Sequence, residues 1–259
     1  MDVANRFAQH VAIALDNARL YAQIQQHNAE LKRSNRELQS FAYVSSHDLQ
    51  EPLRKIQTFG NRLQSKHSHQ LDERGLDYLI RMQNAAARMQ TLIHDLLAFS
   101  RVSTHAQPFK NVNLNTIVTE VISDLEIQME TVQGTFTLDT LPTIESDATQ
   151  MRQLFQNLLS NALKFHRAEV PPVVNISSTQ HNGVCTIYIK DNGIGFDEKY
   201  VDRIFNVFQR LHNRNDYEGT GVGLAVCRKI VERHHGTLTA KSQPNCGTTF
   251  IVTLPMKQI

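Results

Sequence analysis

The absence of helix-breaking residues near the N-terminus constrains the fold of this chain most strongly. Between residue 3 and about residue 65, the first proline is Pro52 and the first glycine is Gly60. Both residue types interrupt helices, because glycine is too flexible and proline lacks an amide hydrogen. The sequence therefore predicts one very long helix over these residues.

The apolar residues of this helix repeat at the interval of a coiled coil. Ile24, Leu31 and Leu38 are seven residues apart, and this spacing keeps one seam facing a partner helix. Leu20 and Phe41 flank the seam. The polar residues between these positions are His27, Asn28, Ser34 and Asn35. We expect a parallel coiled coil with a weakened seam, and hence a homodimer; the alternative is a solvated helix.

A histidine lies on the exposed side of the same helix. At about 100° per residue, His47 points away from the broad apolar face and lies near Glu51 and Arg54. The members of that face are Phe41, Ser45, Asp48, Leu49, Pro52, Ile56, Phe59 and Leu63. Asp48 follows in the chain and can orient the imidazole. Pro52 is expected to kink the helix, because it frees the carbonyl of Asp48.

An exposed imidazole with an acidic neighbour at a kink indicates a nucleophile. From the local context of His47 alone, the alternative is an ordinary surface histidine, since the chain has 12 histidines.

Composition and charge narrow the classes of function. The 259 residues are enough for one large or two ordinary domains. With 27 basic and 25 acidic residues, the chain does not favour nucleic acid or an anionic membrane as its main partner. No apolar run reaches the ~18–20 residues of a membrane span, and the first residues do not resemble a signal peptide. The three cysteines are odd in number and widely spaced, which does not favour a disulfide framework or a zinc site. We therefore expect a cytoplasmic protein.

A second helix is predicted to return antiparallel to the first. The polar segment 66–71 indicates a turn, and Asp72 can cap a helix that runs to about Arg101. Its apolar stripe consists of Leu76, Leu79, Ile80, Gln83, Ala86, Ala87, Ile93, Leu96, Leu97 and Phe99. Two such hairpins from two chains predict a four-helix bundle. Residues 102–112 are expected to form a hinge.

The remaining sequence alternates between helix and strand patterns. It predicts an α+β sandwich with helices on one face of a mixed sheet. Helices are expected over 113–132, 147–166 and 220–235, and strands over 135–141, 173–179, 184–190, 237–241 and 248–254. Asp147 and Gln150 have the spacing of a capping box, and Asn182-Gly183 is a strong hairpin signal.

One of these helices aligns two amides and a lysine. Asn157, Asn161 and Lys164 share a face of the helix opened by Asp147. An amide oxygen can complete the octahedral shell of a Mg²⁺ whose other ligands are phosphates and water, and a lysine suits phosphate charge. The alternative is a helix with polar residues on its solvent face.

Two glycine-rich turns follow. Asp191-Asn-Gly193-Ile-Gly195 ends an apolar strand, where a carboxylate can accept a hydrogen bond from an exocyclic amine and glycines allow close backbone approach. The alternative is an ordinary Asn-Gly turn. Gly219-Thr-Gly221-Val-Gly223 opens a helix and can present N–H groups to phosphate. It is neither a Walker A motif nor a Rossmann turn.

Two further motifs surround the second turn. Phe205-Asn-Val-Phe208, followed by Arg210 and a polar stretch to Tyr217, indicates a mobile lid between two anchoring phenylalanines, or else a surface loop. Gly247-Thr248-Thr249-Phe250 is a glycine-threonine turn near the end of the chain.

The order of these motifs over residues 41–256 resembles that of sensor histidine kinases, with their H, N, G1, F, G2 and terminal glycine boxes. The stretch from His47 to Leu53 is most similar to phytochrome-type and related cyanobacterial kinases, and residues 7–21 resemble the last helix of a GAF sensor domain. The resemblance implies a multidomain protein. Its parts are a signalling helix and coiled-coil linker (1–40), a dimerisation and histidine phosphotransfer domain (41–104) and an ATP-binding domain of the gyrase and Hsp90 type (113–259).

The resemblance also implies roles for individual residues. His47 takes the γ-phosphate of ATP, and Asp48 hydrogen-bonds the ring nitrogen that does not react. Asn161 ligates Mg²⁺ with Asn157 assisting, and Lys164 meets phosphate. The other residues implied in nucleotide binding are Asp191, which recognises adenine, and Gly193, Gly195, Arg210, Gly219, Gly221, Gly223 and Thr248. The phosphoryl group then passes to an aspartate on the receiver domain of a response regulator.

Two alternatives stay open. A gyrase-like or Hsp90-like ATPase would share the nucleotide pocket without needing His47, and a nucleotide-binding signalling scaffold would lack kinase activity. One residue also departs from the family pattern, because Glu51 stands where Thr or Asn is common four residues after the histidine. An ionised carboxylate only accepts hydrogen bonds. We therefore expect a kinase with weak phosphatase activity toward its regulator.

Overall fold

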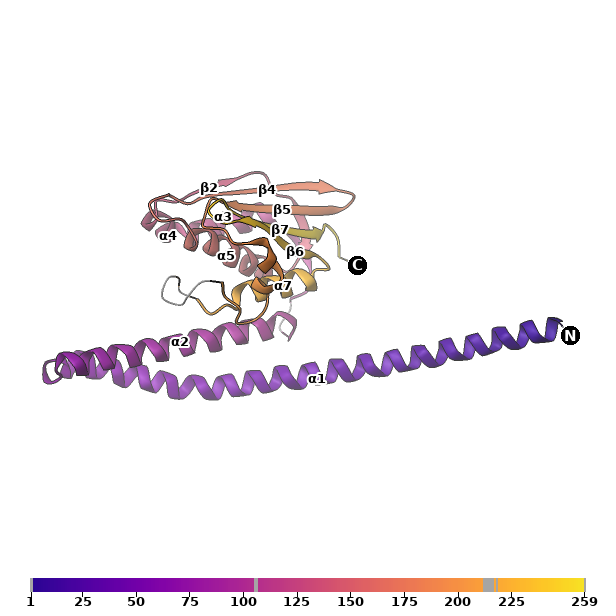
Figure 1. Ribbon diagram of the computed structural model, residues 1–259, viewed down its shortest axis with the longest axis horizontal. Helices are drawn as coiled ribbons and strands as arrows, with labels where there is room; N and C mark the ends of the chain where they lie inside the picture. Colours follow the sequence, from indigo (N-terminus) through magenta and orange to yellow (C-terminus); the bar gives the residue numbers. More distant parts are fainter. Residues whose placement is uncertain (1, 105–106, 212–216, 218, 259) are drawn as a thin grey trace. The chain divides into compact units, whose positions relative to one another are not determined.

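The computed structural model describes residues 2–104, 107–211, 217 and 219–258 (Figure 1). For residues 2–9, 11–14, 16, 28–29, 31–47 and 103–104 it describes the backbone alone. The chain forms two compact units, Met1–Glu51 and Pro52–Ile259. Helix α1 (Asp2–His67) begins in the first unit and ends in the second, without interruption at Pro52.

The long helix predicted from the sequence is therefore confirmed. Leu20 and Ile24, which we expect in a coiled-coil seam, are 55% and 57% exposed in the single chain. The side chains of Leu31, Leu38 and Phe41 lie outside the described residues, so the coiled coil stays a prediction. The kink at Pro52 also stays a prediction.

The second unit begins with a helical hairpin. The end of α1 leads through a short 3₁₀ turn (Ser68–Gln70) into α2 (Glu73–Thr104). Asp72 Oδ1 accepts a hydrogen bond of 2.7 Å from the amide of Gly75, which confirms the predicted cap. A small buried cluster joins the two helices: Leu53, Ala86, Ile93 and Leu97. Large apolar side chains beside this cluster stay exposed: Ile56, Phe59 and Leu63 on α1, and Tyr78, Ile80, Met82 and Met89 on α2.

The predicted hinge over 102–112 is wrong at both ends. Helix α2 continues to Thr104, and strand β1 (Lys110–Asn113) pairs antiparallel with β3 (Thr143–Ser146). The sequence hid both strands, because each has only four residues and one buried apolar side chain, Val112 in β1 and Ile144 in β3.

A mixed five-stranded sheet follows, with the strand order β2-β4-β5-β7-β6. The strands are β2 (Thr135–Leu138), β4 (Val173–His181), β5 (Val184–Asp191), β6 (Thr237–Gln243) and β7 (Gly247–Pro255). Strands β2 and β4 run parallel, and the other neighbours are antiparallel. Asn182 and Gly183 have φ of 49° and 76°, as the predicted tight hairpin requires.

Helices cover one face of this sheet (Figure 1), so the predicted α+β sandwich is confirmed. They are α3 (Leu114–Asp124), α4 (Glu126–Thr131), α5 (Ala148–Lys164), the short α6 (Val201–Ile204) and α7 (Gly223–Arg233), with a 3₁₀ turn at Glu198–Tyr200. The single helix predicted over 113–132 is wrong. The helix breaks at Leu125, a break that turns this side chain into the core.

The core lies between the sheet and α5. Alternate residues of β5, such as Ile187 and Ile189, are fully buried, and Phe155 and Leu158 of α5 pack into the same cluster. The alternation of β5 and the stripe of α5 are the two periodicities expected of elements with one buried face. The sheet and α5 therefore hold the two motifs that begin at Asn157 and Asp191.

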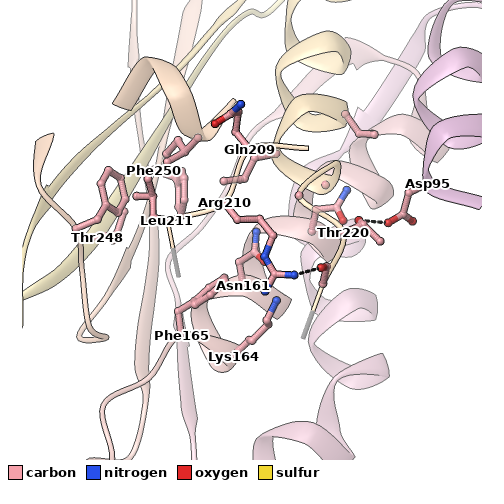
Figure 2. Close-up of a pocket in the computed structure, with 18 of the residues that line it drawn as sticks. Asp95, Asn161, Lys164, Phe165, Gln209, Arg210, Leu211, Thr220, Thr248 and Phe250 are labelled. Carbon is pink, nitrogen blue, oxygen red and sulfur yellow. Dashed lines mark hydrogen bonds between the residues drawn. The ribbon is translucent and has the colours of Figure 1, made fainter. Parts of the chain in front are cut away.

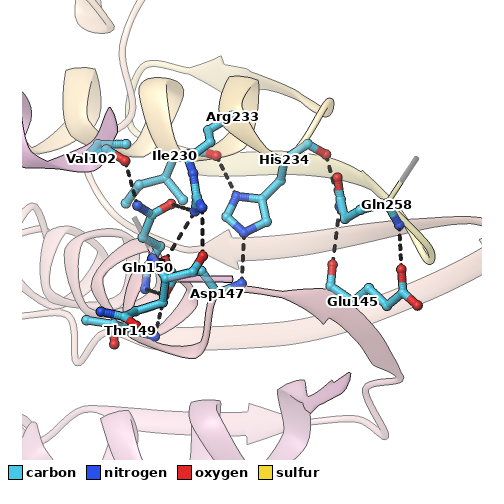
Figure 3. Close-up of polar contacts among 10 residues, drawn as sticks. Val102, Glu145, Asp147, Thr149, Gln150, Ile230, Arg233, His234 and Gln258 are labelled. Atoms are coloured by element: carbon cyan, nitrogen blue, oxygen red, sulfur yellow. Dashed lines mark hydrogen bonds and ion pairs between the residues drawn. The ribbon is translucent and has the colours of Figure 1, made fainter. Parts of the chain in front are cut away.

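Asp147, the N-cap of α5, joins several elements (Figure 3). Its Oδ1 accepts hydrogen bonds from the amides of Thr149 and Gln150, and its Oδ2 pairs with Arg233 at 3.2 Å. The predicted capping box is only half formed. Gln150 Oε1, which would accept from the Asp147 amide in a complete box, accepts from Arg233 at 2.7 Å instead. Gln150 Nε2 donates to the carbonyl of Val102 at 2.8 Å, so α5 is tied to the end of α2.

The amide of Asp147 donates instead to a buried histidine. His234 Nε2 accepts this bond at 3.1 Å, and Nδ1 lies 2.8 Å from the carbonyl of Ile230. The hydrogen of the ring must therefore sit on Nδ1. Burial lowers the pKa of His234 and keeps the ring neutral.

We expect Arg233→Met to destabilise this domain by about 3 kcal/mol, because it leaves the Asp147 carboxylate buried without its cation. The side chains of Arg233 and Asp147 are 20% and 1% exposed. The control is Arg152→Met. Arg152 also pairs with two carboxylates, Glu120 and Asp124, but at the surface, so its loss should cost about 1 kcal/mol or less. Denaturant unfolding measures both, and equal losses would contradict the prediction.

Candidate functional site

A cavity of about 300 Å³ lies between α5, the loop after β5, the segment before α7, and α2. It brings together almost all residues that the sequence motifs singled out for nucleotide binding. Those lining it are Asn157, Asn161, Lys164, Asp191, Gly195, Arg210, Gly219, Gly221, Gly223 and Thr248. Only Gly193 of the predicted set is absent from the lining. Residues from five separate motifs thus converge on one cavity (Figure 2).

Asp191 ends β5 at one side of the cavity and is 8% exposed. Its Oδ1 accepts hydrogen bonds from the amides of Gly193 at 2.8 Å and Thr248 at 3.0 Å. Burial raises the pKa of Asp191, and the two amides oppose this shift. In the part of the chain that the structure describes, no donor is bonded to the other carboxylate oxygen, so Oδ2 can accept a hydrogen bond from a ligand.

Gly193 does not line the cavity, but it allows the loop to pass close to the backbone of Phe165. A Cβ at this position would lie 2.3 Å from the carbonyl oxygen of Phe165, and the next amide, that of Ile194, donates to the same carbonyl at 2.9 Å. Gly195 has a φ of 57°, and a Cβ there would lie 2.1 Å from the carbonyl oxygen of Gln243. Both positions require glycine, because the loop passes directly against neighbouring backbone.

The glycine-rich segment before α7 forms another side of the cavity. The predicted helix start at Thr220 is wrong, because Gly221 has a φ of 77° and this left-handed conformation cannot belong to an α-helix. Helix α7 begins at Gly223, so its N-terminus lies at the cavity. A Cβ at Gly223 would lie 3.2 Å from Asn157 Oδ1, and one at Gly219 would lie 2.7 Å from Lys164 Nζ. Asn157 and Lys164 of α5 therefore face the glycine segment.

Arg210 holds the segment between α6 and α7. Its guanidinium donates hydrogen bonds to the carbonyl oxygens of Gly219 and Tyr217. The Tyr217 ring packs on Phe165, with centroids 5.0 Å apart. Of the two phenylalanines predicted to anchor a lid, Phe205 is buried.

The second anchor is wrong: Phe208 is 54% exposed. The chain at Phe208 has a φ of 65°, a conformation that turns it out of the α6 direction. Residues 212–216 and 218 of the predicted lid lie outside the described residues.

The predicted phospho-acceptor lies in the other unit. His47 is part of α1, but its side chain lies outside the described residues, and Asp48 and Glu51 are exposed. The exposure of the His47 imidazole therefore stays a prediction.

Sequence reasoning missed part of the cavity wall. Three lining residues come from α2: Thr91, Asp95 and Ala98. They lie about 60 residues before the first motif of the cavity and form no local pattern with it, so only tertiary packing reveals them. Phe165 and Phe250 also line the cavity. Each directly follows a motif residue in the sequence, and this position could have predicted that both phenylalanines line the cavity.

No group of three or more His, Cys, Asp or Glu side chains able to hold a metal ion exists among the described residues. The oxygen ligands that α5 offers to the cavity are the amides of Gln153, Asn157 and Asn161. Such a set fits a Mg²⁺ that takes its other ligands from phosphate and water. Within the described ranges, no helix is both long and apolar enough to cross a membrane.

Two family models match the chain. The phospho-acceptor domain called His Kinase A matches residues 37–105. The model for histidine kinase-, DNA gyrase B- and HSP90-like ATPases matches residues 146–258. Together with the cavity, the two matches show that this chain belongs to the histidine kinases.

Curated relatives support this membership. The chain is 41% identical to cyanobacterial phytochrome A from Nostoc sp. over 88% of its length and 30% of that protein. It is 36% identical to the phytochrome-like protein Cph1 from Synechocystis sp. over 87% of its length and 30% of that protein. The chain thus spans about 30% of the length of these relatives.

Solved structures support the fold. Full-length ShkA in complex with AMPPNP aligns with a TM-score of 0.65 at 21% identity, over 84% of this chain and 46% of that one. The histidine kinase ThkA in complex with the response regulator protein TrrA aligns with a TM-score of 0.59 at 22% identity, over 88% of this chain and 66% of that one. At these identities the likeness concerns the fold alone, and it confirms a helical hairpin followed by an α/β domain.

We expect Gly193→Ala to displace Asp191 and to weaken binding of a fluorescent ATP analogue by about 10-fold or more, because the new Cβ would meet the Phe165 carbonyl. The control is Gly183→Ala in the β4–β5 hairpin, where nothing lies within 4 Å of the new Cβ. It should cost about 1 kcal/mol of stability through its positive φ and leave binding intact. Equal affinity for the analogue in the two variants would contradict the prediction.

Proposed function

We propose that this chain is the kinase region of a sensor histidine kinase. It uses ATP and Mg²⁺ to phosphorylate His47 and then transfers the phosphoryl group to an aspartate of a response regulator receiver domain. The observation that carries the proposal is the convergence of five motifs on one cavity, in a chain whose phospho-acceptor match includes His47.

The two sides of the cavity suit the two ends of a nucleotide. The Asp191 carboxylate can accept a hydrogen bond from the adenine amine through Oδ2, because its Oδ1 is already held by two amides. The glycine segment, Lys164 and the N-terminus of α7 suit the phosphates, since helix N-termini and lysines stabilise anions. Adenine would therefore lie beside Thr248 and the phosphates beside Gly221.

Asn161, with Asn157 one helical turn away, would hold the Mg²⁺ ion. When bound, the ion supplies charge neutralisation for the terminal phosphates. The contacts of Arg210 in the structure are with the protein backbone, because its guanidinium is bonded to the carbonyls of Tyr217 and Gly219. We propose that Arg210 positions the glycine segment; its contact with the γ-phosphate stays a prediction.

His47 would act as the nucleophile toward the γ-phosphate. Asp48 would hydrogen-bond the ring nitrogen that does not react, which fixes the tautomer and leaves the lone pair on the other nitrogen. Glu51 is exposed and carries a carboxylate where phosphatase activity would need a hydrogen-bond donor. Weak phosphatase activity therefore stays a prediction.

The hairpin supports a homodimer. Ile56, Phe59 and Leu63 are exposed beside a small buried cluster, and a second hairpin would cover them as in a four-helix bundle. The receiver partner is proposed on the family match and on the ThkA complex with its response regulator protein. We further propose the boundaries 1–40 for the signalling helix, 41–104 for the phosphotransfer domain and 113–259 for the ATP-binding domain. We also propose a cytoplasmic location, because ATP is the phosphoryl donor.

The two alternative functions are less well supported. A gyrase-like or Hsp90-like ATPase does not need the phospho-acceptor domain that matches residues 37–105. A scaffold without kinase activity does not need Asn157 and Lys164 to face the glycine segment with Asn161 beside them in the cavity wall.

We expect His47→Gln to abolish labelling by radioactive ATP, because glutamine cannot act as the nucleophile, while nucleotide affinity stays within about 2-fold of the parent. The label on the parent should be lost in acid and survive alkali. His69→Gln, in the turn between the two helices, is the matched control and should label normally. Label on His47→Gln would refute the assignment of the phospho-acceptor.

We expect Asn161→Ala and Asp191→Ala to weaken ATP binding in different ways, each by about 10- to 100-fold. In Asn161→Ala, the affinity for ATP should fall only when Mg²⁺ is present, and the affinity for adenosine should be unchanged. The loss in Asp191→Ala should be independent of Mg²⁺ and extend to adenosine. Titrations with and without Mg²⁺ measure both. If Asp191→Ala binds adenosine like the parent, the adenine site lies elsewhere.

A further inference from the structure

One face of α2 packs against the nucleotide-binding domain. The carbonyl of Phe99 accepts a hydrogen bond of 2.9 Å from Lys229 Nζ on α7, and the same ammonium lies 4.3 Å from the centre of the Phe99 ring. One turn earlier, the carboxylate of Asp95 accepts a hydrogen bond from the Thr220 hydroxyl. Asp95 and Phe99 are four residues apart, so they lie on the same side of the helix.

This side of α2 continues in both directions. The Val102 carbonyl is bonded to Gln150 of α5, and Thr91 and Ala98 line the cavity. We call these five residues the α2 docking face: Thr91, Asp95, Ala98, Phe99 and Val102. It is at once part of the helical hairpin and one wall of the nucleotide cavity.

Asp95 is the member of this face that carries charge into the cavity. The cavity has two acidic residues among the described ones, Asp191 and Asp95. Asp191 is bonded to the amide of Thr248, whereas Asp95 is bonded to Thr220, which lies between Gly219 and Gly221. Figure 2 shows the Asp95 carboxylate facing the Thr220 hydroxyl. A carboxylate therefore occupies the side of the cavity assigned above to phosphates.

Asp95 and a phosphate would compete for the same donor. A threonine hydroxyl has one hydrogen, and the Thr220 hydroxyl gives it to Asp95. Its oxygen also accepts a weak hydrogen bond of 3.4 Å from the amide of Val222. A phosphate oxygen near Thr220 would find the donor taken and would face a second negative charge, which repels it across the low-dielectric cavity.

We propose that the Asp95–Thr220 hydrogen bond is a latch that makes binding of a nucleotide triphosphate and docking of α2 mutually antagonistic. Entry of the phosphates breaks the latch and weakens the α2 docking face. The docked face, in turn, lowers the affinity for ATP by the same factor, because coupling between two binding equilibria is reciprocal. Adenosine has no phosphates and leaves the latch closed. The inference rests on the proposed function, since it places phosphates at the glycine segment.

Asp95→Asn tests the latch in the full chain. Asparagine keeps the size of the side chain and an oxygen that can accept from Thr220, but it removes the charge. We expect this variant to bind ATP with Mg²⁺ roughly 10-fold more tightly than the parent and adenosine with unchanged affinity. The matched control is Asp77→Asn, which removes the same charge from an exposed position of α2 paired with Arg81. It should bind both ligands like the parent.

Each result of this titration has a separate meaning. Equal affinity of Asp95→Asn and the parent for ATP would overturn the latch. Weaker binding by Asp95→Asn would also overturn it, because the carboxylate would then assist the bound Mg²⁺ and phosphates. If neither ATP nor adenosine bound to the parent, the proposed function itself would fail.

Acylation of Lys229 measures docking without a substitution. Lys229 is bonded to the α2 docking face and does not line the cavity. Mass spectrometry after brief treatment with acetic anhydride should show its modification several-fold faster in saturating ATP and Mg²⁺ than in adenosine. In Asp95→Asn this difference should shrink. Identical Lys229 modification in the two ligands would overturn the antagonism.

Discussion

The pair of amide hydrogen bonds to Asp191 Oδ1 is the interaction on which the site depends. It joins the end of β5 to the loop at Gly193 and to the start of β7 at Thr248. A buried carboxylate is costly unless it is hydrogen-bonded, so these two bonds are what allow a charged group to remain at this position. The same loop donates a backbone hydrogen bond to Phe165, the residue directly after α5. Backbone hydrogen bonds therefore hold together the strand and the helix that carry the site.

Helix α2 connects this site to the hairpin in two ways. Near its C-terminal end, the Val102 carbonyl binds Gln150, and the chain beyond it is held by Arg233, which also pairs with Asp147. About two turns earlier, Asp95 reaches the glycine segment. The first contact belongs to a buried network that phosphates do not approach, and the second lies in the cavity. Of these two contacts, phosphates would therefore compete directly with the second alone.

The sequence predicted those parts of the molecule whose signal is local. The long helix, the Asp72 cap, the Asn182-Gly183 hairpin and the buried stripe of α5 each follow from nearby residues. The motifs near Asn157, Asp191 and Gly221 were found in the same way, and the structure brings them together. Short strands such as β3 were missed, because four residues with one buried apolar side chain carry no periodicity.

The break at Leu125, the start of α7 at Gly223 and the Asp95 wall were not predictable from local pattern. Each depends on tertiary packing or on the backbone conformation of one left-handed glycine. A pattern averaged over neighbouring residues does not detect either of them.

The close approach at Gly193 has a consequence for the kinetics of ligand association. The carboxylate end of the cavity is already assembled by backbone hydrogen bonds, so a purine can occupy it without rearrangement, as in any preorganised site. The glycine end holds a bond that the phosphates would have to displace after this encounter. Association of ATP is then a bimolecular encounter followed by a unimolecular isomerisation, and its observed rate should reach a plateau as ATP concentration rises, whereas that of adenosine should keep rising.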